Sequence, residues 1–393
     1  MKPKLVITLL LLTGITLRFF AARLSAAGEA IEIEGTGGSK LIPISLDGFS
    51  GEAATVLKFD LDVEGFKFVS PDQAQFNVVG SNDPNVQGRV NDRISKASLL
   101  AMAYTGGSLR TQAHRLADDI VMAITRKKGI AQTKIAFKID TGKASEIYIA
   151  DYDGHNRQAV TQDGSVVAAP AWVSGRLALY YTSYKLGNPD VYSQDLLTGA
   201  RKIVARYSGL NTSASVSPDG KRVALIMSKG GSPDVYVCDA DGSNLKQLTK
   251  TREDESSPCW SPDGRTICFV SRIGGGRTLC EVSAGGGEIR RLRTGLVSNP
   301  SEPDWSPDGK TIIFTAQMGD FNICTVPAEG GDATLLVAGE DPSWAPNSRT
   351  VIFTKRGKSG RRFLSLLDVP TKHVKDIAQI SGSASCSQPS WAK

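Results

Sequence analysis

The apolar residues of the C-terminal two thirds of this chain come in short runs, each preceded by similar polar and turn residues. Residues 258–264 read Pro-Cys-Trp-Ser-Pro-Asp-Gly and lead into the alternating run 266–270, and residues 303–309 and 342–347 repeat the arrangement. All five tryptophans of the chain fall on this register, and Val216 takes the one remaining place. The marker lies at positions 172, 216, 260, 305, 344 and 391, with spacings of 44, 44, 45, 39 and 47 residues. This regular spacing predicts an internal repeat.

Each repeat unit predicts four short strands. The Pro-x-Trp segment is a strand whose indole should pack against a neighbouring unit, and Ser-Pro-Asp-Gly has the residues of a tight turn. The alternating run that follows is typical of a half-buried strand. A third strand, such as 234–237, ends in a second turn, such as 239–242, before the fourth. Four strands at this period are typical of a β-propeller blade, which buries its faces only by stacking in a ring.

The phase of the repeat indicates how the ring closes. The first unit starts with residues 134–137, which match a second strand, whereas residues 389–391 match a first strand. We therefore expect the C-terminal strand to complete the blade that begins near residue 134, which removes the exposed sheet edges. Residues 129–393 are then predicted to form a six-bladed β-propeller.

Residues 27–128 carry no repeat and predict a small N-terminal α/β domain. The clearest element is a helix over 111–126, in which Leu116, Ile120 and Ile124 line one face. A short connection should then join this domain to the propeller. The other predicted elements are strands within 31–44, at 75–80 and at 98–104, and a helix at 51–61.

Residues 1–26 have the pattern of a secretory signal peptide. Lys2 and Lys4 precede a 13-residue apolar run, too short to span a bilayer comfortably, and a small residue ends the segment. Arg18 and Arg23, between the run and the predicted cleavage point, leave an uncleaved anchor as the alternative. The segment holds four basic and no acidic residues, so its removal lowers the formal charge from +6 to +2. That charge gives no reason to expect nucleic acid or an anionic membrane surface as a partner.

One region outside the repeat is specific enough to suggest a family. Residues 114–120 read His-Arg-Leu-Ala-Asp-Asp-Ile and are followed by Gly-Ile-Ala at 129–131 and by the strand that opens the repeat. Together with the segment 60–66 and the Ser-Pro-Asp-Gly turns, this helix and its junction resemble the TolB family over nearly all of residues 30–393.

The resemblance implies a function other than catalysis. Members of the TolB family are periplasmic components of the Tol–Pal system of Gram-negative bacteria. The chain is accordingly expected to be an exported, monomeric protein that binds a peptidoglycan-associated lipoprotein through one face of the propeller. Its N-terminal segment is expected to contact a TolA-like inner-membrane protein, without inserting into the membrane itself. The implied role is in outer-membrane integrity and cell division.

A search for catalytic and metal-binding motifs agrees with that expectation. The three histidines, His114, His155 and His373, form no zinc-binding pair, and no Gly-x-Ser-x-Gly motif occurs. The acidic turns at 151–154 and 239–242 lack the remaining ligands of a calcium loop and are interpreted as blade turns. We therefore predict no catalytic residue, no metal and no cofactor. The alternative is a secreted propeller that assists a peptidase or a glycan-processing enzyme or binds a ligand, which would need a hydrolase domain or a His-rich channel.

Four polar residues on the predicted helix resemble a catalytic cluster: His114, Arg115, Asp118 and Asp119. Residues four positions apart share a helix face, which places His114 beside Asp118 and Arg115 beside Asp119. A surface ion pair between Arg115 and Asp119, or a contact with the propeller, explains these residues better, because the sequence indicates no nucleophile and no pocket.

The cysteines are interpreted as small buried apolar residues. An exported chain permits disulfides, and the best candidate for a bridge is Cys268 with Cys280, which flank residues 274–276 on adjacent predicted strands. The full set is Cys238, Cys259, Cys268, Cys280, Cys324 and Cys386.

Loops that enter the innermost strands gather at one end of a propeller, around its channel. Acidic residues recur in these loops, so we expect an acidic rim that attracts a partner with basic groups. The resemblance places the lipoprotein at the same end, near Leu210 and Ser256. The predicted partner-binding residues are Leu210, Asn211, Asp254, Glu255, Ser256, Asn299, Ser301, Glu302, Glu340 and Asp341.

Overall fold

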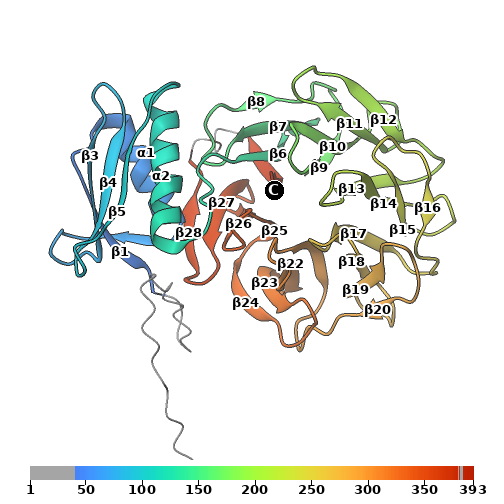
Figure 1. Cartoon of the computed structure of the whole chain (residues 1–393). Helices are drawn as coiled ribbons and strands as arrows, with labels where there is room; N and C mark the ends of the chain where they lie inside the picture. Colours follow the sequence, from blue (N-terminus) through green and yellow to red (C-terminus); the bar gives the residue numbers. More distant parts are fainter. Residues whose placement is uncertain (1–39, 379, 381–383) are drawn as a thin grey trace, which may run out of the picture. The chain divides into compact units, whose positions relative to one another are not determined.

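The computed structural model describes residues 40–378, 380 and 384–393. The predicted signal peptide and the first part of the strand region at 31–44 lie outside these residues. The N-terminal part is an α/β unit with a five-stranded mixed sheet in the order β2-β1-β3-β4-β5 (Figure 1). Its elements are β1 (Ile42–Asp47), α1 (Gly51–Val63), β2 (Phe66–Phe68), β3 (Phe76–Ser81), β4 (Gln87–Asp92), β5 (Ser98–Ala103) and α2 (Leu109–Thr125).

The α/β unit buries its core between the sheet and the two helices. Leu57 and Leu61 of α1 and Leu116 and Ile120 of α2 are buried in one cluster with Ile44 of β1. Both predicted helices and the strands β3 and β5 are confirmed. The sequence did not indicate β4, because Gln-Gly-Arg-Val-Asn-Asp contains a single large apolar residue. In the part of the chain that the structure describes, neither helix is long and apolar enough to cross a membrane.

The rest of the chain forms six four-stranded antiparallel sheets around a central channel, which confirms the six-bladed β-propeller (Figure 1). We number the sheets as blades 1 to 6. Blade 1 consists of β29 (Ser385–Trp391), β6 (Lys134–Asp140), β7 (Ser145–Asp151) and β8 (Gln158–Ala159). Blade 2 consists of β9 (Val167–Trp172), β10 (Ala178–Ser183), β11 (Asp190–Asp195) and β12 (Arg201–Ala205), and blade 3 of β13 (Asn211–Val216), β14 (Arg222–Met227), β15 (Asp234–Asp239) and β16 (Lys246–Gln247). Blade 4 consists of β17 (Glu255–Trp260), β18 (Thr266–Ser271), β19 (Thr278–Ser283) and β20 (Arg290–Arg291). Blade 5 consists of β21 (Pro300–Trp305), β22 (Thr311–Met318), β23 (Asp320–Pro327) and β24 (Thr334–Ala338), and blade 6 of β25 (Glu340–Trp344), β26 (Thr350–Arg356), β27 (Arg362–Asp368) and β28 (His373–Asp376).

The ring is closed by β29, as the phase of the repeat predicted. β29 runs antiparallel to β6, with Ser385 opposite Asp140 and Trp391 opposite Ile135. The indole of Trp391 also donates a hydrogen bond to the Thr133 hydroxyl at 2.8 Å. The innermost strand of blade 1 therefore comes from the opposite end of the propeller sequence from its other three strands.

The tryptophans end the innermost strands and pack against the preceding blade. Trp260 of blade 4 lies in one apolar cluster with Ile226 of blade 3, and its indole N–H donates to the Ser215 carbonyl of that blade at 2.9 Å. Trp172 makes the equivalent bond to the Ser390 carbonyl at 3.0 Å. These indoles therefore supply both apolar contact and a hydrogen bond between blades, as expected for a buried Trp.

In blade 3, Val216 takes the place of the tryptophan, and tyrosines fill the interface between blades 2 and 3. Tyr180 of blade 2 and Tyr236 of blade 3 are buried in the cluster against which Val216 packs. The Tyr180 hydroxyl donates to the Ala240 carbonyl of blade 3 at 2.6 Å. Tyrosine thus replaces both contributions of the missing indole.

The Ser-Pro-Asp-Gly turns are held by their own side chains. In blade 4 the Ser261 hydroxyl donates to Asp263 at 2.6 Å, and the Arg265 N–H donates to the same carboxylate at 3.0 Å. These hydrogen bonds lower the pKa of Asp263. Gly264 has a φ of 68°, a left-handed conformation that glycine adopts without strain. The turn is therefore fixed by local sequence, and the Asp is used for structure.

All six cysteines are buried and free, which confirms that they are small buried apolar residues. The predicted bridge between Cys268 and Cys280 is wrong. Cys268 lies opposite Cys259 on β17, whereas Cys280 lies opposite Phe269. Cys268 and Cys280 are thus offset by one residue, and their side chains point to opposite faces of the sheet.

Candidate functional site at the channel entrance

A bulge in every innermost strand shapes the channel. At the bulge one residue adopts a left-handed backbone conformation, although none of the six is glycine. Such a position costs about 1–3 kcal/mol for a non-glycine residue, so the surrounding blade must hold it in place. The six residues, called the entrance ring below, are Ala169 (φ 51°), Ser213 (54°), Ser257 (52°), Glu302 (51°), Asp341 (54°) and Gln388 (51°).

The entrance ring and the residues that follow it line a cavity of about 230 Å³ in the channel. In blade 3 the following residue is Ala214. In the other blades it is proline, namely Pro170, Pro258, Pro303, Pro342 and Pro389. Proline has no N–H, so these bulges leave no unpaired backbone donor at that position. The chemical character of the cavity is therefore set mainly by the ring side chains.

Four of the six entrance-ring residues are joined from blade to blade by hydrogen bonds. The Glu302 carboxyl accepts from the Asp341 N–H at 3.2 Å, and Asp341 accepts from the Gln388 N–H at 3.0 Å. Gln388 in turn accepts from the Ala169 N–H at 3.0 Å. Within the described residues, the small side chains of Ser213 and Ser257 make no such bond. Blades 5, 6, 1 and 2 are therefore linked at the ring, whereas the ring side chains of blades 3 and 4 make no bond to a described residue of a neighbouring blade.

The two ring carboxyls, Glu302 and Asp341, sit close together, and neither forms an ion pair with a described residue. Burial raises the pKa of Glu302 to about 8, and the neighbouring Asp341 contributes to the rise. Burial also raises the pKa of Asp341. Thr315 donates to Glu302 at 2.8 Å and Thr354 donates to Asp341 at 3.0 Å. Near neutral pH Glu302 therefore holds a proton, which relieves repulsion between the two carboxyls. Across the described residues no group of three or more His, Cys, Asp or Glu side chains is arranged to hold a metal ion.

Two further acids predicted for the rim point into the protein. Glu255, at the start of β17, is buried and accepts from the Val235 N–H at 3.2 Å. Burial raises the pKa of Glu255 to about 7. Glu340 is also buried, in ion pairs with Arg356 at 2.6 Å and with Arg362 at 2.8 Å. Both residues thus help to hold the strand starts.

Of the five acids expected at the rim, Glu255 and Glu340 are buried, whereas Glu302 and Asp341 are half-buried and line the cavity. Only Asp254 is exposed. Glu255 and Glu340 open strands, so the strand register turns their side chains inward, and the bulge aims Glu302 and Asp341 into the cavity. A role for these residues in partner binding stays a prediction.

The other predicted residues divide between structure and surface. Asn211 is fully buried, and its side-chain amide donates to the Tyr207 carbonyl at 2.8 Å, which fixes the loop before β13. Asn299 is exposed, with a left-handed φ of 48°. The half-buried members of the set are Leu210, Ser256 and Ser301. These four, with Asp254 and with Glu302 and Asp341 of the entrance ring, are the predicted residues that a partner can reach.

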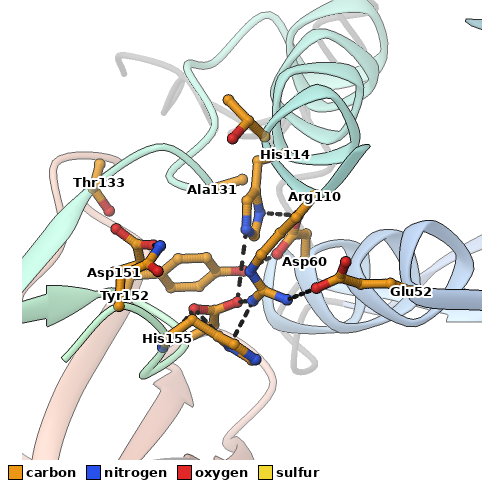
Figure 2. Close-up of polar contacts among 12 residues, drawn as sticks. Glu52, Asp60, Arg110, His114, Ala131, Thr133, Asp151, Tyr152 and His155 are labelled. Carbon is orange, nitrogen blue, oxygen red and sulfur yellow. Dashed lines mark hydrogen bonds and ion pairs between the residues drawn. The ribbon is translucent and has the colours of Figure 1, made fainter. Parts of the chain in front are cut away.

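A second polar site, which the sequence did not predict, lies where α1 and α2 meet the turn between β7 and β8 (Figure 2). His114 Nδ1 lies 2.7 Å from one Asp60 oxygen, and its Nε2 lies 3.6 Å from Asp153. The Tyr152 hydroxyl donates to the other Asp60 oxygen, and Arg110 pairs with Asp153. These side chains, called the junction cluster below, join the α/β unit to blade 1.

Burial controls the electrostatics of the junction cluster. Asp60 and Tyr152 are fully buried, and burial raises the pKa of both, while His114 opposes the rise at Asp60. Burial and the guanidinium of Arg110 lower the pKa of His155, whose Nδ1 lies 2.6 Å from that guanidinium. His155 is thus suited to accept a hydrogen bond from Arg110. The cluster thus connects the α/β unit to blade 1, with each of its carboxyl groups facing a cationic group or a hydrogen-bond donor.

Of the four polar residues singled out on α2, His114 and Asp118 serve this junction, whereas Arg115 and Asp119 bond within the α/β unit. His114 contacts the propeller, as one of the two explanations expected. The other, an ion pair between Arg115 and Asp119, is wrong: Arg115 donates to a backbone carbonyl at 3.2 Å, and Asp119 accepts from Tyr104 at 2.6 Å. Asp118 accepts a backbone hydrogen bond at 2.8 Å from the connection between α2 and β6.

Comparison with known proteins identifies close likenesses in sequence. A family model described as the TolB beta propeller domain matches residues 121–393. The Tol-Pal system protein TolB of Francisella tularensis (strain WY96-3418) is 33% identical over 159 residues, which cover 38% of this chain and 37% of that protein. The protein of the same name from Nitrosomonas europaea is 31% identical over 234 residues, covering 51% of this chain and 55% of that protein. The matches thus span about half the length of these relatives or less.

Solved structures share the fold. The crystal structure of TolB from Acinetobacter baumannii has a TM-score of 0.80 at 23% identity, covering 90% of this chain and 97% of that one. A putative TolB from Agrobacterium tumefaciens has a TM-score of 0.50 at 18% identity, covering 67% of this chain and 99% of that one.

Proposed function

This chain belongs to the TolB β-propeller family, and we propose that it is a non-catalytic periplasmic scaffold of the Tol–Pal cell-envelope system. In this proposal it binds a peptidoglycan-associated lipoprotein at the channel entrance and thereby supports outer-membrane integrity and cell division. The names of the matching relatives, Tol-Pal system protein TolB, support the assignment to that system.

The entrance ring is the observation that carries the proposed binding site. Six left-handed, non-glycine positions encircle one cavity, and backbone strain of this kind persists where the structure around it imposes it, often at binding sites. Around the cavity the loops offer exposed Asp254 and Asn299 and the half-buried Leu210, Ser256 and Ser301. This mixture of polar rim and partly apolar contacts suits a protein partner.

The proposal also includes how the chain is divided and exported. A signal peptide at 1–26 is cleaved, and residues 27–128 and 129–393 are the two domains. α2 ends at Thr125 and β6 begins at Lys134, so the proposed boundary falls in the connection between them. The N-terminal segment of the mature chain then contacts a TolA-like inner-membrane protein.

Calorimetric titration with the lipid-free lipoprotein tests the binding site. Ser256→Trp places a bulky neutral side chain beside the entrance ring and should weaken binding at least about tenfold, or ~1.4 kcal/mol. Ser283→Trp makes the same change at an exposed position of blade 4 at the other end of the channel and should leave the affinity unchanged. Equal affinities for both variants and the parent, with equal melting temperatures, would move the site away from the entrance. A parent protein that does not bind the lipoprotein would refute the proposed partner.

A further inference from the structure

The loops of blades 3 and 4 at the entrance carry an excess of exposed positive charge. These loops, called the cationic loops below, are 206–210 and 228–233 in blade 3 and 249–254 and 272–277 in blade 4. They hold six exposed cationic side chains and two exposed acidic ones. The cations are Arg206, Lys229, Lys250, Arg252, Arg272 and Arg277, and the acids are Glu253 and Asp254.

Strand register places all four loops at one end of the channel. Asn211 lies opposite Met227 in blade 3, and Glu255 lies opposite Ser271 in blade 4. The hairpin loops after Met227 and Ser271 therefore lie beside the loops that enter the innermost strands. Blades 3 and 4 are also the two blades whose ring side chains bond to no residue of a neighbouring blade that the structure describes.

Most of these charges are not compensated within the protein. Arg206 has one ion pair, at 3.6 Å to Asp190, and the Lys229 ammonium lies 4.2 Å from the centre of the Tyr207 ring. Over the described part of the chain the other four cations form neither an ion pair nor a ring contact. Those four are Lys250, Arg252, Arg272 and Arg277.

The cationic loops are also open around their backbone. At Gly231, Gly275 and Gly276 no heavy atom lies within 4 Å of the position that a Cβ would occupy. A ligand can therefore approach the chain closely there. Arg272 and Arg277 flank the glycine run 274–276, and a guanidinium can bind a carboxylate through two parallel hydrogen bonds.

From this charge and geometry beside the entrance ring, we propose that the cationic loops are the docking surface for an acidic segment of the protein partner. The inference rests on the proposed function, since it names the chemistry of the partner that the entrance binds. It reverses the polarity predicted from the sequence, because Asp254 is the one exposed residue among the five predicted rim acids. Glu253 and Asp254 stand among the cations, so a folded partner that avoids them fits better than a uniformly anionic membrane.

Charge reversal at the entrance, with a matched control, tests the inference. Arg272→Glu combined with Arg277→Glu should slow association with the lipid-free lipoprotein about tenfold at low salt, since charge pairs mainly steer encounter. Lys221→Glu combined with Arg265→Glu makes the same charge change on exposed turns at the other end of the channel. The control should keep the association rate within about twofold of the parent. Raising the salt concentration should slow the parent and the control but not the entrance variant.

The outcomes separate this inference from the proposed function. If the parent binds the lipoprotein, either of two results overturns the proposal that the cationic loops bind an acidic segment. These are equal slowing of association in both double variants and no slowing in either. Where the parent does not bind it, the proposed function fails and an octaglutamate peptide becomes the deciding probe. Octaglutamate binding that only the entrance variant loses supports the inference, and absence of binding overturns it. Phosphatidylglycerol vesicles that bind through the same arginines, without octaglutamate binding, assign the loops to a membrane and also overturn it.

Discussion

The junction cluster and the entrance ring both bury carboxyl groups, but they compensate the charge differently. At the junction Asp153 faces the Arg110 guanidinium and Asp60 faces the His114 ring, so side chains of α2 pair with acids on other elements. At the entrance the carboxyls receive hydroxyl and backbone N–H groups, and burial raises the pKa of Glu302 to about 8. The junction cluster should therefore lose its stabilising effect if one member of a pair is removed. The entrance carboxyls are instead expected to change charge with pH near neutrality.

Removing residues 388–393 should have the largest effect, because it damages both sites. Gln388 belongs to the entrance ring, and Trp391 stacks on Tyr152 of the junction cluster with ring centroids 6.0 Å apart. The loss opens two strand edges in blade 1 and should cause aggregation and loss of the cooperative calorimetric transition. A truncated protein that melts like the parent would contradict the closure.

Arg110→Met should have the next largest effect. It leaves Asp153 buried without its cation, a change that costs about 3–5 kcal/mol in comparable buried pairs. Urea unfolding followed by tryptophan fluorescence measures the loss. If the free energy of unfolding falls by less than about 1 kcal/mol, the junction does not depend on charge pairing and the comparison with the entrance fails.

Glu302→Gln tests the pH dependence of the entrance. The pKa of Glu302 is about 8 in the folded protein and 4.5 ordinarily, so the folded state keeps a proton that the unfolded state releases. Stability should therefore fall as pH rises between these values. The amide removes that part of the fall, leaving the parts due to Glu255 and Glu64, whose pKa values burial also raises.

The expected result is a variant about 1–2 kcal/mol more stable than the parent at pH 8.5 and nearly equal to it at pH 4.5. Urea unfolding at the two pH values provides the measurement. Stability curves that run parallel for parent and variant would show that Glu302 does not titrate as its burial implies.

Arg115→Met should have the smallest effect. Its side chain makes one hydrogen bond, to a backbone carbonyl, and lies one helical position from the junction cluster. A change within about 0.5 kcal/mol is typical of such surface positions. A loss as large as that of Arg110→Met would mean that both measure the stability of α2 instead of a specific ion pair.

The propeller could be predicted from the sequence because a repeat multiplies a weak signal. One Ser-Pro-Asp-Gly turn says little, but the marker recurs in every blade, and its phase also identified the closing strand. The entrance ring could not be predicted in the same way. Its left-handed residues are Ala, Ser, Glu, Asp and Gln, which share no backbone preference. The bulge is imposed by pairing with the next strand, and only the proline after most ring residues hinted at it.

The helix sequences contain a signature of the junction cluster, namely polar residues on the buried faces of α1 and α2. Asp60 lies between Leu57 and Leu61 on the buried face of α1, and His114 lies beside Leu116 on that of α2. A charged residue within an apolar helix face needs a partner when it is buried. The helix pattern shows that a partner exists, but its identity depends on a turn in blade 1 that is distant in sequence.

The pairing of β29 with β6 also has a consequence in time. These strands are separated by almost the whole propeller sequence, so the first blade encountered along the chain is the last to be completed. Blades 2 to 6 can each assemble from neighbouring segments, whereas blade 1 must wait with an open edge for its fourth strand. Pairing between such distant segments slows folding and exposes intermediates to aggregation. A chaperone that binds the open edge of β6 would therefore protect this protein at the folding stage at which it is most prone to aggregate.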